Sequence, residues 1–183
     1  GMDAVGPDGP WSPRGNRAND IQSLWYQQLI SGAEFAKILG KSKLQDKWTK
    51  IAEKLQMNFG KEFVSPEQNF VYDHLKFDGT QDKQIRPNQI FCAPLLTDEI
   101  RAKVLKNVIT NLTSVYGVLS LYPYDENFHP YHQYSPYYVK DAAYHNGVIW
   151  TWLSGSVISE LCNFDKQEMA YQLTDDLVQQ ILD

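Results

Sequence analysis

Residues 20–60 read DIQSLWYQQLISGAEFAKILGKSKLQDKWTKIAEKLQMNFG, and apolar side chains recur through them at helical spacing. The first pattern begins at Ile21 and predicts a helix that runs to about Leu39. A second apolar face follows at the same spacing: Leu44, Trp48, Ile51, Leu55 and Phe59. We expect a capping residue before each helix and a glycine after it: Asp20 and Gly40, then Ser42 and Gly60. Two helices with so short a link predict an antiparallel helical hairpin.

Further helical patterns follow along the chain. We expect a helical turn at residues 88–95 and a helix that begins at Thr97, where Thr, Asp and Glu form a typical helix start. A final pair is expected over about 141–162 and 166–182, with Asp141 as the first cap. The first member of this pair is apolar nearly all round, so we expect it to be buried.

Two segments lack helical periodicity and read as loops. Residues 63–84 contain the β-like run Phe70-Val71-Tyr72 and the turn signal Asp78-Gly79, so a small β-hairpin can form near 63–78. Residues 114–140 are dense in Tyr, Pro, His and Asp, and loops of such length often carry function. The predicted fold class is all-α, with helical hairpins, long loops and at most one small β-hairpin.

Length and charge restrict the kinds of partner. The 183 residues suit a single domain over residues 1–183. The formal charge of −5 gives no footprint for nucleic acid, and no apolar run approaches the ~20 residues that cross a bilayer. We therefore expect no nucleic-acid and no membrane partner. With no visible secretion signal, Cys92 and Cys162 read as buried thiols in a reducing, cytoplasmic compartment.

The chain is rich in aromatic residues, with 5 Trp, 11 Tyr and 8 Phe. Tyr and Trp combine an apolar face with a polar handle, which suits a core beside a polar groove that binds sugars. A Tyr-rich core without any ligand explains the same composition.

Several classes of catalytic motif are missing from the sequence. It has no Gly-rich phosphate loop, no Cys-x-x-Cys, no His-Glu-x-x-His and no Gly-x-Ser-x-Gly. Of the four histidines, His129 and His132 lie in a Pro-Tyr loop with no carboxylate at helical spacing, as solvated residues do. We expect neither a metal nor a cofactor.

Aspartates beside irregular loops are the remaining candidates for chemistry: Asp3, Asp20, Asp125 and Asp141. Glycoside hydrolysis needs two carboxyl groups, one protonated to assist the leaving oxygen and one to activate water or attack. Helix caps and turns need aspartates at the same places, so the positions alone leave both roles open.

Five blocks occur in one order: Met2-Asp3-Ala4; Ser12-Pro13-Arg14 with Asp20-Ile21 and Leu24-Trp25-Tyr26; Ile85-Arg86-Pro87-Asn88-Gln89-Ile90-Phe91; Tyr116-Gly117 with Ser120-Leu121, Pro123 and Asp125; and Asp141-Ala142-Ala143-Tyr144-His145-Asn146-Gly147 with Trp150 and Trp152. Together they resemble the C-terminal amylo-α-1,6-glucosidase domain of glycogen debranching enzymes. The resemblance covers residues 2 to about 155.

This resemblance implies an α/α toroid of six helical hairpins with the active site at one end. It also implies an inverting glycosidase that removes α-1,6-linked glucose from glycogen or a related α-glucan. By the match, Asp3 stands at the position of the general acid. The implied substrate-binding residues are Asp20, Arg86, Asn88, Gln89, Tyr116, Asp125, Asp141, His145, Asn146 and Trp150. The resemblance also implies that Trp25, Tyr116, Trp150 and Trp152 form pocket walls or the packing behind them, and for each Trp we favour packing.

The sequence also departs from the family pattern. Asp20 replaces the usual Glu, and Lys140 replaces the Arg usual before Asp141, which removes any bidentate contact. No general base is identified: Glu160 superficially resembles the Ser-Glu of relatives, but it follows the Trp block too soon. An alternative is therefore a degenerate, non-catalytic module that binds carbohydrate or serves assembly.

The length is short for the implied fold. The family domain has roughly twice as many helices, so this chain resembles the C-terminal half of a toroid. An open toroid leaves apolar faces at its edges. We therefore expect a homo-oligomer or a complementary chain that completes the toroid.

Overall fold

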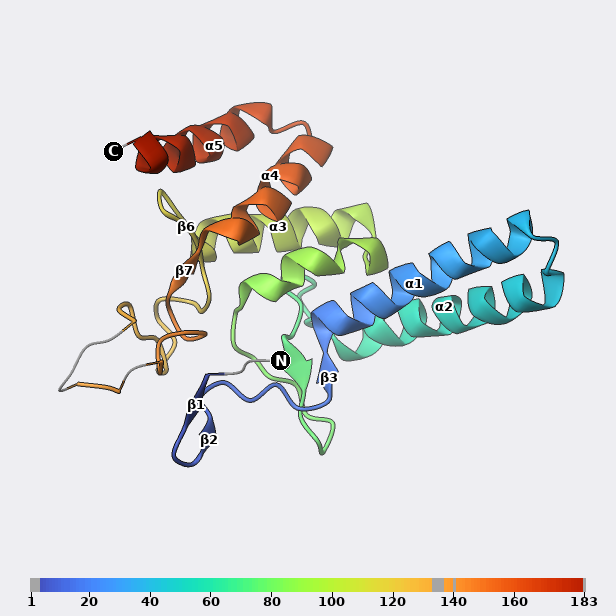
Figure 1. Ribbon diagram of the computed structural model, residues 1–183, viewed down its shortest axis with the longest axis horizontal. Helices are drawn as coiled ribbons and strands as arrows, with labels where there is room; N and C mark the ends of the chain where they lie inside the picture. Colours follow the sequence, from blue (N-terminus) through green and yellow to red (C-terminus); the bar gives the residue numbers. More distant parts are fainter. Residues whose placement is uncertain (1–3, 133–136, 140, 183) are drawn as a thin grey trace.

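The computed structural model describes residues 4–132, 137–139 and 141–182, and helices dominate it (Figure 1). The α-helices are α1 (Asn19–Ile38), α2 (Ser42–Glu62), α3 (Asp98–Leu112), α4 (Ser154–Asn163) and α5 (Gln167–Leu182). The 3-10 helices are η1 (Pro87–Leu95) and η2 (Thr151–Leu153). The strands are β1 (Val5–Gly6), β2 (Gly9–Pro10), β3 (Arg17–Ala18), β4 (His74–Leu75), β5 (Thr113–Ser114), β6 (Gly117–Leu119) and β7 (Ile149–Trp150). Within the described residues, no helix combines the length and the apolar content of a membrane span.

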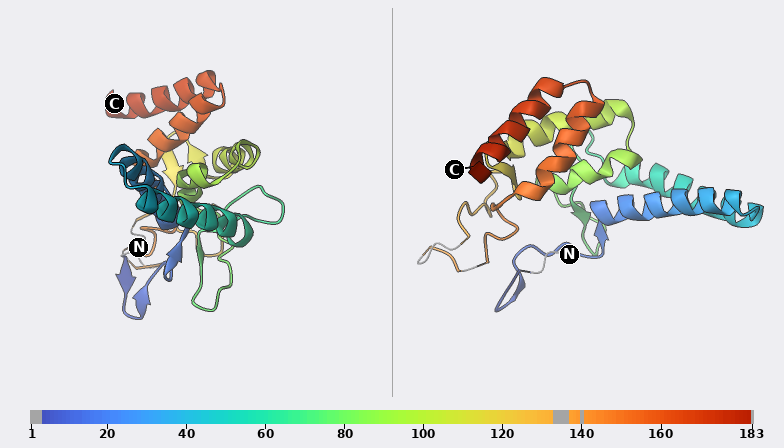
Figure 2. Two further views of the ribbon diagram at one scale, coloured as in Figure 1. Left: turned by 90° about the vertical axis from the view of Figure 1, so that its right-hand side faces the viewer. Right: turned by 45° about the horizontal axis from the view of Figure 1, so that its top comes forward.

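Helices α1 and α2 form the predicted hairpin and extend together away from the rest of the molecule (Figures 1 and 2). Gly40 has φ +66°, a left-handed conformation that favours glycine. The amides of Gly40 and Lys41 donate to the carbonyls of Lys37 and Ala36, which is the Schellman arrangement. Gly40 therefore ends the first helix as predicted.

The other predicted boundaries of this hairpin are wrong. Asp20 lies within the first turn of α1, after the N-cap Ala18, and Ser42 is the first residue of α2 rather than its cap. Helix α2 continues through Gly60, because residues on both sides of this glycine, Phe59 and Phe63, pack into the same core cluster. Phe59 and Phe63, one turn apart, stack in that core with ring centroids 4.7 Å apart.

Two apolar clusters form the core, and η1 and α3 contribute to both. Ile90 of η1 and Leu105 of α3 belong to the cluster that α4 and α5 complete. Cys92 of η1 and Val104 of α3 belong to the cluster around Phe59 of α2. The predicted helical turn at residues 88–95 therefore lies at the centre of the fold.

The two cysteines have different surroundings, although both were expected to be buried. Cys92 is buried in the cluster around Phe59, whereas Cys162 is exposed on α4. Helix α4 turns Val157 and Leu161 toward the core, and the next residue, Cys162, falls on the outer face. Both cysteines are free thiols.

The region around residues 63–84 pairs both with itself and with a distant segment. Antiparallel bridges join Val64 to Val71 and, across the Asp78-Gly79 turn, Leu75 to Gln81. Strand β4 also pairs with β3, which precedes α1, so that His74 lies opposite Ala18. The amide of Asn19 also donates to the carbonyl of Asp73 at 2.9 Å. These contacts fasten the start of α1 to the loop that follows α2.

The predicted helix over residues 141–162 begins only at Ser154, as α4. Asp141 does not cap a helix; it lies in a turn with φ +70°. Gly147 has φ +146°, and a Cβ there would lie 2.1 Å from the carbonyl oxygen of His129. Past this break, β7 pairs antiparallel with β6, which pairs in turn with β5. Residues 149–150, predicted as part of a helix, therefore form the third strand of a small antiparallel sheet.

Candidate active site

A cleft of about 310 Å³ opens where α1, η1, η2 and the 144–150 segment meet. Its polar side is formed by Arg14, Asp20, Asn88 and His145. Its aromatic side is formed by Phe91, Tyr144, Trp150 and Trp152. A volume of this size falls at the lower end of the range for small-molecule sites.

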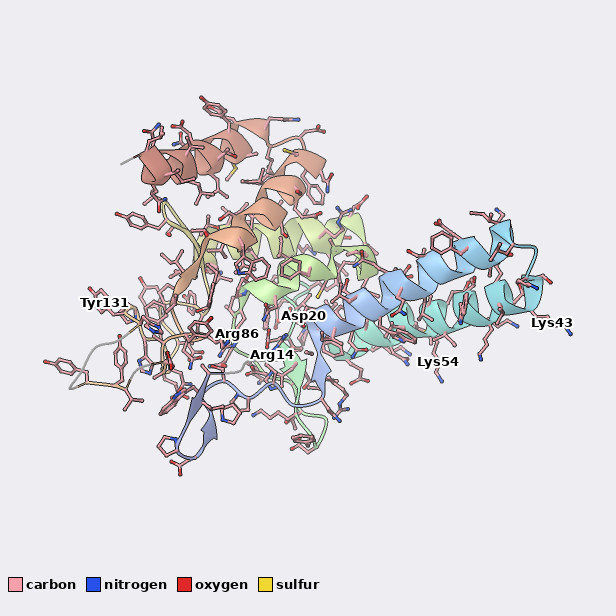
Figure 3. The ribbon with its side chains drawn as sticks, in the orientation of Figure 1. Arg14, Asp20, Lys43, Lys54, Arg86 and Tyr131 are labelled. Carbon is pink, nitrogen blue, oxygen red and sulfur yellow. The ribbon has the colours of Figure 1, made fainter. Side chains whose placement is uncertain are left out.

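One buried carboxylate holds the polar side together. Arg14 Nε donates to Asp73 Oδ2 at 2.6 Å, and Asn88 Nδ2 donates to Asp73 Oδ1 at 2.8 Å. The guanidinium of Arg14 also reaches Asp20, with Nη1 2.9 Å from Oδ1. Figure 3 shows Arg14 in the chain that leads into α1 and Asp20 at the start of that helix. Three residues of the cleft are thus oriented, directly or through Arg14, by Asp73.

The charges of this network are fixed. Burial by itself would raise the pKa of Asp73, but the His74 ring, the Arg14 charge and the Asn88 amide outweigh it and lower the pKa to about 2. Burial likewise would lower the pKa of Arg14, and the carboxylates of Asp73 and Asp20 raise it instead. Asp73 and Arg14 therefore stay ionised at neutral pH.

A second polar group supports the cleft from behind. Arg86 donates to the carbonyls of Ser120 and His145 and to Asn146 Oδ1, the last at 2.9 Å. Ser12 Oγ donates to the same Asn146 oxygen at 2.6 Å. Arg86 and Asn146 are buried, and both line a second cleft of about 330 Å³ beside the first. They hold the backbone of the His145 turn in place.

The aromatic side contains two tryptophans in different states. Trp150 meets Tyr144 edge-to-face with centroids 4.8 Å apart, and its Nε1 donates to the Tyr144 carbonyl at 3.2 Å. Trp152 stacks on Phe91 with centroids 5.7 Å apart and is 62% exposed. The expected packing is therefore wrong for Trp152, and also for Trp25, which is 45% exposed on α1.

Of the substrate-binding residues that the resemblance implied, four line the first cleft: Asp20, Asn88, His145 and Trp150. Three are buried behind it: Arg86, Gln89 and Asn146. Gln89 Oε1 accepts from the Val71 amide at 3.2 Å and Nε2 donates to the Arg86 carbonyl at 2.9 Å, so its side chain is occupied by backbone. Gln89 therefore does not reach the cleft.

The structure places the other implied residues elsewhere. Tyr116 is 58% exposed at the turn between β5 and β6. Asp125 accepts from Gln84 Nε2 at 3.1 Å and from the amide of Asn127 at 2.9 Å, as a turn residue does. Asp141 lies 3.2 Å from His132 Nε2. None of the three lines the cleft. Asp3, the implied general acid, and Lys140 lie outside the described residues.

Glu160, the residue that resembles a Ser-Glu base, has a structural partner instead. Arg101 of α3 donates to both of its carboxylate oxygens, from Nη2 at 3.1 and 3.0 Å. Asn163 adds a further hydrogen bond at 3.0 Å. Glu160 therefore joins α4 to α3 and does not line the cleft.

Asp73 and two groups beside it have the donor types that bind divalent cations. The ligand atoms of Asp73, His74 and Asp82 lie within 4.8 Å of one another. His74 Nδ1 is 3.4 Å from Asp73 Oδ2 and 3.3 Å from Asp82 Oδ2. Arg14 Nε already donates to the same Asp73 oxygen, so the positive guanidinium lies beside these groups.

Sequence reasoning missed several residues of this site. Arg14, Phe91 and Tyr144 line the cleft and lie within matched blocks, but the blocks imply no role for them. Asp73 carried no signal at all, because it lies in a loop without a motif. Its burial against Arg14 is what reveals it.

Comparisons with known proteins agree with this architecture. A family model described as amylo-alpha-1,6-glucosidase matches residues 1–183. The structure is similar to neutral trehalase Nth1 from Saccharomyces cerevisiae, with a TM-score of 0.63 and 15% sequence identity. That alignment covers 87% of this chain and 30% of the trehalase chain. No curated protein matches significantly. The structural likeness confirms the predicted fold, helical hairpins that form part of an α/α toroid.

Proposed function

Because this chain belongs to the amylo-alpha-1,6-glucosidase family, we propose that it is part of a glycoside hydrolase that removes α-1,6-linked glucose from glycogen or a related α-glucan. The observation that carries the proposal is the composition of the cleft. Asp20 and Asn88 supply hydrogen-bonding groups for hydroxyls, and Trp150 and Trp152 supply flat apolar surfaces in the same cavity. Sugars present both kinds of surface.

The proposed mechanism is inversion. A carboxylic acid protonates the glycosidic oxygen while a carboxylate about 6.5–9.5 Å away activates water on the opposite face of the sugar. Asp3 is the proposed acid, by the match of Met2-Asp3-Ala4 to the family. Asp20, oriented by Arg14, is proposed to bind sugar hydroxyls near the reacting centre.

One observation favours a second candidate, a non-catalytic module that binds carbohydrate or serves assembly. Among the described residues that line the cleft, Asp20 is the sole carboxylate, whereas hydrolysis requires two. The chain also spans 30% of the trehalase to which it is similar. In this case the cleft binds a sugar without cleaving it.

We also propose a protein partner, either a second copy or a complementary chain with the remaining helices of the toroid. Large apolar side chains of α1 and the residue after it are more than half exposed: Ile21, Leu24, Phe35, Ile38 and Leu39. Exposed large apolar side chains that gather on one helix are typical of an interface. The net charge of −5 and the two free thiols support the earlier proposals of no nucleic-acid partner and a reducing, cytoplasmic compartment.

Glucose release from a branched limit dextrin tests the catalytic proposal directly. The chain is incubated with the dextrin alone and together with the helices that complete the toroid. We expect release only from the completed toroid, and D3N should abolish it because the acid proton is lost. Exposed Asp8 supplies the matched control, D8N, which should keep full activity. Undiminished release by D3N would rule out Asp3 as the acid.

A further inference from the structure

Trp152 is the most exposed of the five tryptophans, although it lines the cleft. It lies in η2, directly after β7, and is 62% exposed. One face of its indole stacks on Phe91 of η1, with the planes 15° apart. One face of this large apolar ring is packed and the rest is largely exposed, so a ligand that covered it would remove apolar surface from water.

The neighbouring Trp150 shows what a tryptophan in a packing role looks like in this cleft. Tyr144 meets its ring edge-to-face, and His145 stacks on it with centroids 6.2 Å apart. Its indole N–H is satisfied by a backbone carbonyl. Among the residues that the structure describes, the ring of Trp152 stacks on Phe91 alone. The two side chains are two residues apart in sequence and differ in role.

We propose that Trp152, backed by Phe91, is a stacking platform for a hexopyranose ring at the cleft. A glucose ring carries its hydroxyls at the edge and C–H bonds on its faces, and these polarised C–H groups suit the negative face of an indole. Asp20 and Asn88 lie in the same cleft to pair with edge hydroxyls. The proposal deepens the proposed function, since it names the residue that orients the sugar, and it rests on the cleft being a sugar site.

The charge arrangement favours a sugar over an apolar ligand. The polar side of the cleft presents Asp20 and Asn88, whose side chains can pair with hydroxyl groups that a purely apolar ligand lacks. The groove between α3 and α5, by contrast, is lined mainly by apolar side chains such as Ile109 and Met169. The first cleft instead combines an aromatic face with polar groups.

Isothermal titration with panose, a glucose trisaccharide that contains an α-1,6 bond, tests the platform. W152A should weaken panose binding about tenfold, because the stacking surface is removed. W152F keeps a flat ring and should restore most of the affinity. The matched control is W25A, which removes an exposed tryptophan of α1 outside the cleft and should leave binding unchanged.

Three results would overturn the platform: no binding of panose to the wild-type chain, equal affinity for W152A and wild type, or equal losses for W152A and W25A. A change in self-association of W152A without a change in panose affinity would likewise overturn it and assign Trp152 to a protein contact. Failure of the proposed hydrolysis is separate. Panose binding that depends on Trp152, with no glucose release from the completed toroid, would retain the platform and reject catalysis.

Discussion

The two sides of the cleft are held by different physical means. The polar side depends on buried charges: Arg14 and Asn88 donate to Asp73, and Arg14 in turn pairs with Asp20. The aromatic side depends on backbone conformation, in particular the left-handed Gly147. The two sides of one cavity are therefore held in place for different reasons, and each should respond to a different perturbation.

The largest effect is expected from removing the charge that organises the polar side. D73A should destabilise the protein by about 3–5 kcal/mol, because the buried guanidinium of Arg14 is left without its main partner. Urea unfolding followed by circular dichroism measures the change. D46N, at an exposed position of α2, is the control and should stay within about 0.5 kcal/mol of wild type. A similar small change for D73A would mean that the network does not hold the polar side.

The aromatic side should be most sensitive to a substitution of Gly147. G147A places a Cβ 2.1 Å from the His129 carbonyl oxygen and forces a residue with a side chain to φ +146°. We expect a loss of about 2–4 kcal/mol in unfolding free energy. G155A is the control, since a Cβ at Gly155 meets nothing within 4 Å. If G147A were as stable as G155A, the turn that carries His145 would not depend on the glycine.

Acid should loosen the polar side selectively. The pKa of Asp73 falls from its ordinary 3.8 to about 2 on folding, so the folded state favours the carboxylate. This contribution, about 2 kcal/mol, is fully present above about pH 4 and is lost as the pH falls toward 2. Unfolding free energies measured between pH 6 and pH 2 give the profile. The part of the acid loss due to this residue should be absent in D73N, and an unaltered profile would contradict the assignment.

The smallest effect on stability is expected at Trp152. Because its ring is mostly exposed, W152A should change the unfolding free energy by no more than about 1 kcal/mol, the range of one aromatic pair. Thermal unfolding of W152A and wild type, compared with F91A, measures this. A loss of several kcal/mol in W152A would show that the ring is a core residue rather than an accessible surface.

Local periodicity predicted the helices well where the neighbouring chain does not compete. Helix α3 begins after Thr97, whose hydroxyl accepts from the Ile100 amide at 3.4 Å, and α5 covers nearly its predicted span. The prediction failed at residues 141–153, where the same apolar residues pair with β6 instead. Periodicity reports which residues are apolar, and cannot report that a distant strand is available.

The site was predictable to the extent that a matched block supplied it. Asp20, Asn88, His145 and Trp150 come from three blocks and line one cleft. Tyr116, Asp125 and Asp141 also come from matched blocks, but they do not line the cleft. Their distance from it depends on the path of the loops in the folded chain, which a local motif does not specify. The role of Asp73 was not predictable, since no local sequence pattern indicates that a carboxylate will be buried.

The sequence by itself determined the hairpin of α1 and α2, the order of the blocks and the family, since these depend on residues close together in the chain or on motifs. Tertiary structure alone decided which carboxylate organises the polar side of the cleft and which tryptophan is largely exposed to solvent. Asp73 acquires its partners from Arg14 and Asn88, and Trp152 acquires one from Phe91, each far away in the chain. Such pairings arise when helices pack and bury charges, so they exist only in the folded molecule.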